Sequence, residues 1–310
     1  MRESQKTILI LGGTGHYGRH AVFSLKQKGV QVRILTRDPM KARMILGDQL
    51  EFIGGDITST DSLAAAVHGV DGMIVSISAF SPRQIRRLKE IEQDAVLSAF
   101  EEARQAGVKR VVYISVFEVN QDTATRFRLP IPNVKAAVEQ SLARFDFNWT
   151  ILGAPPSMEI FFAMIRGNAM MVPGGGPSRL PSVSPVDAGE IAAQAVLRDD
   201  LAGRRFKMVG PEAISFPDAA RRISRVWGRS ITFRKIPLIF PLIAYYLTSP
   251  LTPFSNRLYF VHTMLGFVRL LNQFPQTQVA EVPKLHRELL SIFNYTPTTL
   301  EMEAARRKDL

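Results

Sequence analysis

Three glycines spaced three residues apart, Gly12, Gly15 and Gly18, separate the apolar run 7–11 from a helical pattern. A loop between a buried strand and a helix offers free backbone N–H groups and the positive end of the helix dipole, which together bind phosphate. Gly12 would permit the sharp turn, Gly15 the close approach of a diphosphate, and Gly18 close helix–strand packing. The spacing predicts a nucleotide-binding loop, the alternative being a tight structural turn. Its other predicted contacts are Thr14, His16 and Tyr17.

The residues after the next apolar run, 30–35, bear on which nucleotide would bind. A cofactor with a free ribose 2′-hydroxyl usually meets an acid here, but this chain has Thr36 and Arg37. A guanidinium can pair bidentately with a 2′-phosphate, and a threonine hydroxyl can add a hydrogen bond. Asp38 precedes Pro39, a combination that predicts a helix cap. NADP(H) is therefore favoured over NAD(H), unless Arg37 is simply a solvated charge.

Polar residues also follow two further predicted strands. Asp56 ends the third strand, where its carboxylate could accept a hydrogen bond from an adenine amino group or, alternatively, cap a turn. Ile57 lies beside it. Ser76, Ile77 and Ser78 end the fourth strand and are expected to line the cofactor ribose, mainly through their backbone.

The elements that position these residues alternate between strand and helix. Strands are predicted at 7–11, 30–35, 51–56, 72–78, 110–115 and 149–152, and helices at 19–28, 61–67 (capped by Thr60), 90–106 and 133–144. This alternation predicts an α/β fold with a doubly wound parallel sheet.

Beyond residue 153 the pattern loosens. It predicts a loop over 171–185, helices at 187–197 and 216–227, and a strand at 204–210. We expect a nucleotide-binding domain at 1–153 and a smaller, mostly helical C-terminal substrate lobe at 154–310, interlocked with the first.

Composition narrows the class of protein. Of 310 residues, 46% are hydrophobic and 22% charged, as in globular proteins. The absence of cysteine excludes disulfides and thiolate chemistry, and the five histidines lack paired ligand spacing, so no metal site is expected.

A net charge of +11 fits either a solvated surface or an anionic partner, such as a phosphorylated cofactor or a membrane face. No nucleic-acid-binding motif accompanies this charge, so nucleic acid is not an expected partner. The polar start of the chain contains no signal peptide, which predicts a cytoplasmic protein.

Seven segments, in order over most of the chain, form a specific series. They are "GGTGHYGR", "VRILTRDP", "GDITSTDSL", "AFEEARQAGVKRVVYISV", "WTILGAPPSME", "VSPVDAGEIAAQAVL" and "TPTTLEMEAARR". In these segments the chain resembles the NmrA-like group of atypical short-chain dehydrogenases/reductases. The resemblance implies a Rossmann lobe, a C-terminal substrate lobe and a cleft between them. Members include NAD(P)H-dependent reductases of quinones and phenolic compounds, and NADP-binding regulators without known turnover.

The resemblance also implies where catalysis would occur. Reductases of the wider superfamily often use Ser, Tyr and Lys, with the Tyr four residues before the Lys, to protonate a carbonyl oxygen as hydride reaches its carbon. Ser115 and Lys135 match two of these positions, but the third is Ile131. Lys135 would then be the acid or the anchor of the nicotinamide ribose, or the site would bind cofactor without turnover. Tyr113 is a weaker candidate and is expected to point away.

Residues 236–280 are strongly apolar, with only Arg257 and Arg269 charged. The stretch 236–254 nearly reaches bilayer-spanning length, but its four prolines argue against a membrane helix. Segment 236–274 has three interpretations: a substrate-lobe core with a lid, a homodimer interface, or a peripheral membrane contact. Nearby apolar side chains could form a cleft wall or ordinary core, namely Met158, Phe161, Phe162 and Met164.

Together these features predict an NADPH-dependent reductase that transfers hydride to a lipophilic carbonyl or quinone. Two alternatives remain open: a non-catalytic NADP redox sensor, which the missing tyrosine favours, and an accessory factor that docks at a membrane complex. We expect a cytoplasmic protein, with peripheral membrane association if the apolar segment is an interface.

Overall fold

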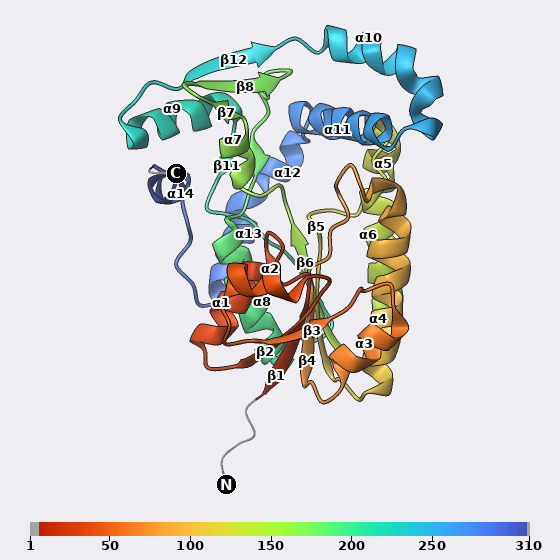
Figure 1. The fold of residues 1–310 in the computed structure, drawn as a ribbon. Helices are drawn as coiled ribbons and strands as arrows, with labels where there is room; N and C mark the ends of the chain where they lie inside the picture. Colours follow the sequence, from red (N-terminus) through yellow and green to blue (C-terminus); the bar gives the residue numbers. More distant parts are fainter. Residues whose placement is uncertain (1–5, 309–310) are drawn as a thin grey trace.

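The computed structural model describes residues 6–308 and has a parallel β-sheet at its centre (Figure 1). Seven strands lie in the order β10-β6-β5-β4-β1-β2-β3, and every neighbouring pair is parallel. They are β1 (Thr7–Leu11), β2 (Gln31–Thr36), β3 (Glu51–Gly54), β4 (Gly72–Val75), β5 (Arg110–Val116), β6 (Asn148–Ala154) and β10 (Arg204–Lys207). The order reverses after β1, which confirms the predicted doubly wound Rossmann sheet.

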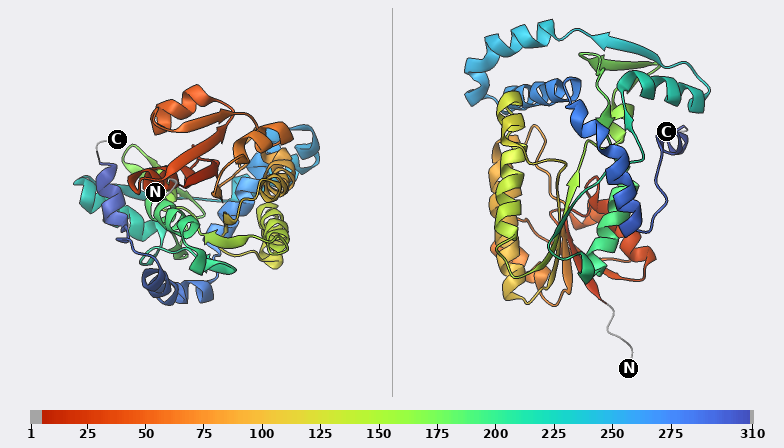
Figure 2. Two further views of the ribbon diagram at one scale, coloured as in Figure 1. Left: turned by 90° about the horizontal axis from the view of Figure 1, so that it is seen from below. Right: turned by 180° about the vertical axis from the view of Figure 1, so that it is seen from behind.

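Helices cover both faces of this sheet (Figure 2). The alternating side chains of β1 show the division: Ile8 and Ile10 pack toward α1 and α8, whereas Leu9 and Leu11 pack toward α3 and α4. A strand buried on both faces reads as a continuous apolar run, as β1 does. The covering helices are α1 (Gly18–Gln27), α8 (Pro185–Leu197), α3 (Thr60–Val67), α4 (Ala95–Gln105) and α6 (Ile131–Leu142), and α2 (Pro39–Leu46) follows β2.

The remaining elements lie mainly beyond the carboxyl ends of the strands, at the end of the molecule opposite the N-terminus (Figure 1). They include a small sheet of order β12-β8-β7, a pair β11-β9 and several helices. The strands are β7 (Ile165–Arg166), β8 (Ala169–Pro173), β9 (Leu180–Pro181), β11 (Ala213–Ile214) and β12 (Thr232–Ile236). The helices are α5 (Gln121–Phe127), α7 (Glu159–Ala163), α9 (Phe216–Trp227), α10 (Ile239–Thr248), η4 (Ser249–Phe254), α11 (Asn256–Asn272), α12 (Gln276–Ala280), α13 (Val282–Ile292) and α14 (Leu300–Arg306).

Several local predictions were wrong in detail. The strands predicted at 51–56 and 72–78 end at Gly54 and Val75, so Asp56 and Ser76–Ser78 follow their strands. Ser59, not Thr60, caps α3, because its hydroxyl accepts the N–H of Ser62. The helix predicted over 90–106 begins as a π-helix, η2 (Glu90–Asp94), before α4. The predicted loop 171–185 includes the end of β8 and all of β9. The strand predicted at 204–210 ends at Lys207, and it pairs with β6 as the edge of the central sheet.

The seam between α1 and α8 makes folding stability depend on pH. Gly189 of α8 lies so close to α1 that a Cβ on it would be 2.4 Å from the His20 Cβ. Burial, reinforced by the charge of Arg19, lowers the pKa of His20 to about 4. A lowered histidine pKa means that the fold favours the neutral ring, so its contribution is complete above pH 6.5 and is lost as pH falls toward 4.

We therefore expect the free energy of unfolding to fall between pH 7 and pH 4 by about 2 kcal/mol on account of this partly exposed group. Urea unfolding followed at several pH values measures the slope. The His20→Gln variant should show a smaller change in the free energy of unfolding over this pH range. An unchanged pH dependence in the variant would assign the acid sensitivity to other groups.

Candidate functional site

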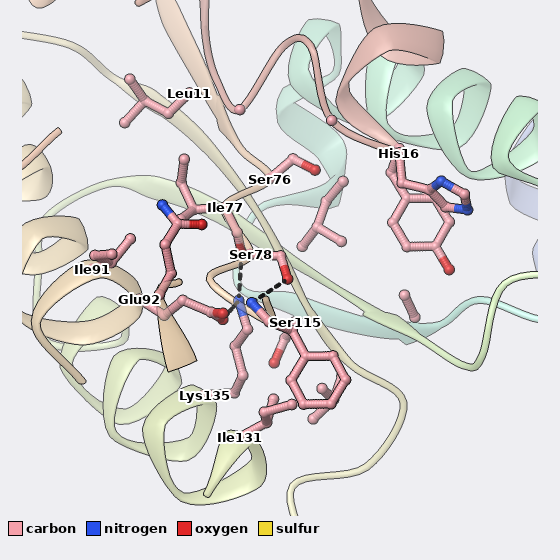
Figure 3. Close-up of a pocket in the computed structure, with 18 of the residues that line it drawn as sticks. Leu11, His16, Ser76, Ile77, Ser78, Ile91, Glu92, Ser115, Ile131 and Lys135 are labelled. Atoms are coloured by element: carbon pink, nitrogen blue, oxygen red, sulfur yellow. Dashed lines mark hydrogen bonds and ion pairs between the residues drawn. The ribbon is translucent and has the colours of Figure 1, made fainter. Parts of the chain in front are cut away.

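A pocket of about 910 Å³ lies at the carboxyl ends of the central strands. All the predicted cofactor-binding and catalytic residues except Gly18 line it: Gly12, Thr14, Gly15, His16, Tyr17, Thr36, Arg37, Asp56, Ile57, Ser76, Ile77, Ser78, Ser115 and Lys135. Figure 3 shows part of this lining, with His16 well separated from the group around Lys135. The fold thus brings together residues from the ends of several strands, as expected for a doubly wound sheet.

The glycine loop has the backbone geometry that the sequence predicts. Gly12 has φ +84°, and a Cβ on it would be 2.2 Å from the Ser76 carbonyl oxygen. A Cβ on Gly18 would be 2.2 Å from the Gly12 carbonyl oxygen, so Gly18 supports the loop from behind and does not line the pocket. Side chains at these positions would displace the loop, which leaves bare backbone facing the pocket, as a diphosphate requires.

Two side chains fasten this loop to the segment after β6. The Nε2 atom of His16 lies 2.9 Å from the Ser157 hydroxyl and also contacts the Glu159 carboxylate. Burial lowers the pKa of His16, although Glu159 opposes the shift. The Tyr17 hydroxyl donates to the Pro155 carbonyl at 3.1 Å. The loop is therefore tied to the start of the C-terminal elements, a connection that no local motif predicted.

The end of β2 presents cations to the pocket. Arg37 is exposed, and Lys41, in the first turn of α2, lines the same part of the pocket. Asp38 is occupied as the cap of α2, since its carboxylate accepts the Lys41 N–H at 2.9 Å. The predicted cap at Asp38 is confirmed. Asp38 is the acid next to Arg37 in the sequence, and its carboxylate is therefore engaged in a hydrogen bond to the backbone.

Asp56 closes a turn and also faces Arg37. One carboxylate oxygen accepts from the Thr58 N–H at 2.9 Å and from its hydroxyl at 2.8 Å, and the other lies 4.0 Å from the Arg37 Nε. Burial opposes ionisation, but the Thr58 hydrogen bonds and the charges of Arg37 and Arg87 outweigh it and lower the pKa of Asp56. The turn-capping interpretation is confirmed, and the second oxygen is the one available to a ligand.

Lys135 is held in a buried ion pair at the floor of the pocket (Figure 3). Its ammonium donates to the Ile77 carbonyl at 3.1 Å and lies 2.9 Å from a Glu92 carboxylate oxygen. Burial alone would lower the pKa of Lys135, but the neighbouring Tyr113 and Glu92 outweigh it and raise that pKa. The lysine therefore stays cationic at neutral pH and is a poor proton donor. Two of its three N–H groups are engaged, which leaves one for a ligand.

Glu92, like Lys41, lines this site although the sequence analysis did not predict it. Its side chain is 2% exposed, and its second carboxylate oxygen accepts the Ala79 N–H at 2.6 Å. It sits in the π-helical turn η2, a type of distortion often found at functional sites. Nothing in the sequence separates Glu92 from the other acids of this helix, because its role depends on packing against α6.

The other residues around Lys135 are poor candidates for a proton donor. Ser115 is buried and its hydroxyl has no hydrogen-bond partner among residues 6–308. Ile131 lines the pocket where a tyrosine would stand. The Tyr113 ring lies under the Lys135 ammonium, 5.1 Å from it, and burial raises the pKa of Tyr113 to about 12. Tyr113 thus supports the lysine and does not line the pocket.

One wall of the pocket is apolar and combines side chains from α11 and the turn after it with two from the start of α6 and the residues before it. Its side chains are Leu129, Ile131, Phe267, Leu270, Leu271 and Phe274. Helix α11 of segment 236–274 thus belongs to the cleft, in line with the substrate-lobe interpretation. None of the four side chains suggested as a cleft wall lines this pocket: Met158 and Phe161 are buried in the main core, and Phe162 and Met164 pack against it, which confirms the alternative of ordinary core packing. Over residues 6–308, no helix has both the length and the apolar character needed to cross a bilayer.

A sequence model of the NmrA-like family matches residues 4–284. The chain belongs to this family. Among its relatives is the photosystem II assembly factor Ycf39 of Synechocystis sp., 23% identical over 235 residues, which span 74% of this chain and 71% of that protein. The family assignment confirms the resemblance noted in the sequence.

Two solved structures share this architecture across almost the whole chain. The triphenylmethane reductase of Citrobacter sp., complexed with NADP(H), has a TM-score of 0.74 and 17% identity, covering 97% of this chain and 99% of its own. An NADPH-dependent quinone oxidoreductase of Escherichia coli, complexed with NADPH, has a TM-score of 0.69 and 18% identity over the same shares. At such low identity the likeness shows the fold, and the site must be argued from this chain's own residues.

Proposed function

We propose that this NmrA-like protein binds NADP(H) and uses NADPH to reduce a lipophilic quinone or aromatic carbonyl compound. The observation that carries the proposal is that one pocket joins the glycine loop, the cations at the end of β2, the Lys135–Glu92 pair and an apolar wall. Relatives in fold reduce a quinone and triphenylmethane dyes with this cofactor, which supports the same class of reaction.

The residues present suit each part of the cofactor. Bare backbone between Gly12 and Gly18 would hold the diphosphate. Arg37 and Lys41 would bind the 2′-phosphate, and one Asp56 oxygen is available to the adenine amino group. Ser76, Ile77 and Ser78 line the pocket between these groups and Lys135, where the nicotinamide ribose would lie. The nicotinamide supplies a hydride when bound.

Lys135 would act as a fixed cation and not as the proton donor. Its free N–H can hold the ribose hydroxyls, and its charge stabilises negative charge that develops on the acceptor oxygen as hydride arrives. The reduced oxygen would take its proton from water, because the neighbouring groups release theirs reluctantly. A quinone suits such a site, since its reduced anion is stabilised by the ring and needs less help from an acid.

A screen of NADPH oxidation tests this proposal. Purified protein would be mixed with NADPH and a series of acceptors: menadione, a short-chain ubiquinone, benzylideneacetone and a triphenylmethane dye. We expect turnover with a quinone, fastest with NADPH, and none without an acceptor. Binding of NADPH without oxidation across the series would overturn the reductase and leave the cofactor-binding part intact.

A second candidate function is an NADP-dependent sensor or accessory factor without turnover. The observation that favours it is that Ile131 replaces the usual acid while Lys135 is already engaged by Glu92 and Ile77. The family relative Ycf39 is named as an assembly factor, which supports a role other than catalysis for this protein too. Tight NADPH binding, without NADPH oxidation by any acceptor in the series, would support this second function.

We further propose that cofactor binding belongs to residues 1–153 and substrate binding to residues 154–310. The two parts interlock, because β10 and α8 of the second part return to the central sheet and its helix packing.

A further inference from the structure

An apolar arm covers one end of the molecule and is left largely open to solvent. We define the arm as residues 236–261, which comprise α10, η4 and the start of α11. Tyr246, Leu247 and Phe254 are 69%, 74% and 87% exposed. The arm's other exposed apolar side chains are Ile239, Ile243, Leu251 and Val261. Figures 1 and 2 show α10 at the far edge, remote from the N-terminus. Isolated exposed apolar residues are ordinary, but a contiguous group marks an interaction surface.

The charge around this arm has one sign. Residues 223–280 contain no Asp or Glu, and their basic residues are Arg225, Arg229, Arg234, Lys235, Arg257 and Arg269. Arg234 and Lys235 are exposed immediately before the arm, and Arg257 is exposed within it. Arg257 and Arg83 line one surface hollow together with Asn256. Exposed apolar side chains are thus bordered by cations in a stretch of sequence, 223–280, that contains no acid.

We propose that the arm docks on the surface of an anionic lipid membrane. A bilayer interface offers anionic headgroups to the bordering cations and acyl chains to the apolar side chains, so both features of the surface are satisfied together. Pairing with a second copy through this surface would instead bring like charges together. Four prolines, Pro237, Pro241, Pro250 and Pro253, interrupt the segment, and no helix among residues 6–308 can span a bilayer, so the arm would lie on the membrane.

Two arginines from outside the arm attach it to the rest of the molecule. The Arg86 guanidinium donates to the Thr252 carbonyl and lies 5.1 Å from the centre of the Tyr259 ring. Arg128 donates to the Tyr245 hydroxyl. The arm is therefore presented as an attached surface and not as a free tail.

Docking would bring the pocket close to lipid. Helix α11 contributes Val261 to the arm and, further along, Phe267, Leu270 and Leu271 to the pocket wall. A lipid-dissolved acceptor would then reach the pocket beside a single helix. This consequence rests on the proposed function, whereas docking itself does not.

Vesicle flotation tests the proposal. Full-length protein would be mixed with phosphatidylcholine vesicles made with or without phosphatidylglycerol, at low and high salt. We expect flotation with the anionic vesicles only, weakened at high salt. The Leu247→Ser/Phe254→Ser and Arg234→Gln/Lys235→Gln variants should each bind the anionic vesicles at least about tenfold more weakly than the wild type. Leu290→Ser, an exposed leucine on α13, should float like the wild type.

Light scattering, NADPH binding and thermal melting of the same variants complete the test. Failure of the folded wild type to float with anionic vesicles, or equal flotation of all variants, would overturn the inference. Self-association that the Leu247→Ser/Phe254→Ser change abolishes, without vesicle binding, would assign the arm to a second copy and equally overturn it. If the protein oxidises NADPH with a water-soluble quinone but does not bind vesicles, the proposed reductase function stands and the proposed membrane docking is wrong.

Discussion

Replacing Arg37 by aspartate should weaken NADPH binding about 100-fold and leave NADH binding within about threefold of the wild type. The guanidinium lies exposed at the end of β2, where it lines the pocket and no other role fully occupies it. A carboxylate there would repel a 2′-phosphate and could accept a hydrogen bond from a 2′-hydroxyl, the interaction typical of NAD sites. Fluorescence titration with both nucleotides measures the change in preference.

Arg43→Asp provides the matched control for this change. Arg43 lies on the neighbouring helix α2 and is exposed, but its guanidinium lies over the Phe52 ring and does not line the pocket. Its replacement alters net charge equally and should change both affinities little. Equal losses of NADPH affinity in the Arg37→Asp and Arg43→Asp variants would mean that Arg37 acts only through general electrostatics and does not recognise the phosphate.

Replacing Lys135 by methionine should abolish turnover, with a loss of at least about 100-fold, and destabilise the fold by about 3 kcal/mol. The stability loss arises because the Glu92 carboxylate, 2% exposed, is left without its cation. The double variant Lys135→Met/Glu92→Leu removes both charges and should regain most of that stability, since an apolar pair can replace a buried ion pair. Activity should stay absent, because the cation that we propose to lie beside the nicotinamide is still missing.

Urea unfolding and NADPH oxidation, measured on the same preparations, separate the two effects. Lys89→Met is the control, because the ion pair of Lys89 with Asp94 is exposed and its loss should cost little. A double variant that recovers both stability and turnover would show that Lys135 only holds the structure together. The proposed electrostatic role would then be wrong.

The parts of the site that the sequence predicted are those set by strand ends. A glycine loop after β1, a cation after β2 and a polar residue at the end of β5 each follow from local patterns, because parallel strands end at one edge of the sheet. That is why Gly12, Arg37 and Ser115 line one pocket. The same logic predicted the cap at Asp38, where the proline that follows leaves few conformations.

The parts that it missed depend on contacts between distant segments. Glu92 meets Lys135 only because η2 packs against α6, and one acid in a helix resembles another until that packing is known. The apolar wall from α11 is a similar case, since the same side chains are compatible with a core, a dimer interface or a lid. The boundary errors near residues 59 and 90 have local causes, a cap one residue earlier and a π turn.

Calorimetric titration of the wild-type protein with NADPH and with NADH is the most direct test of the central claim, that the loop after β1 and the arginine after β2 form one NADP(H) site. We expect saturable heat for one NADPH per chain and binding at least about tenfold weaker for NADH, because NADH lacks the charge-assisted phosphate contact. No heat with either nucleotide at millimolar concentration, or equal affinity for both, would contradict it.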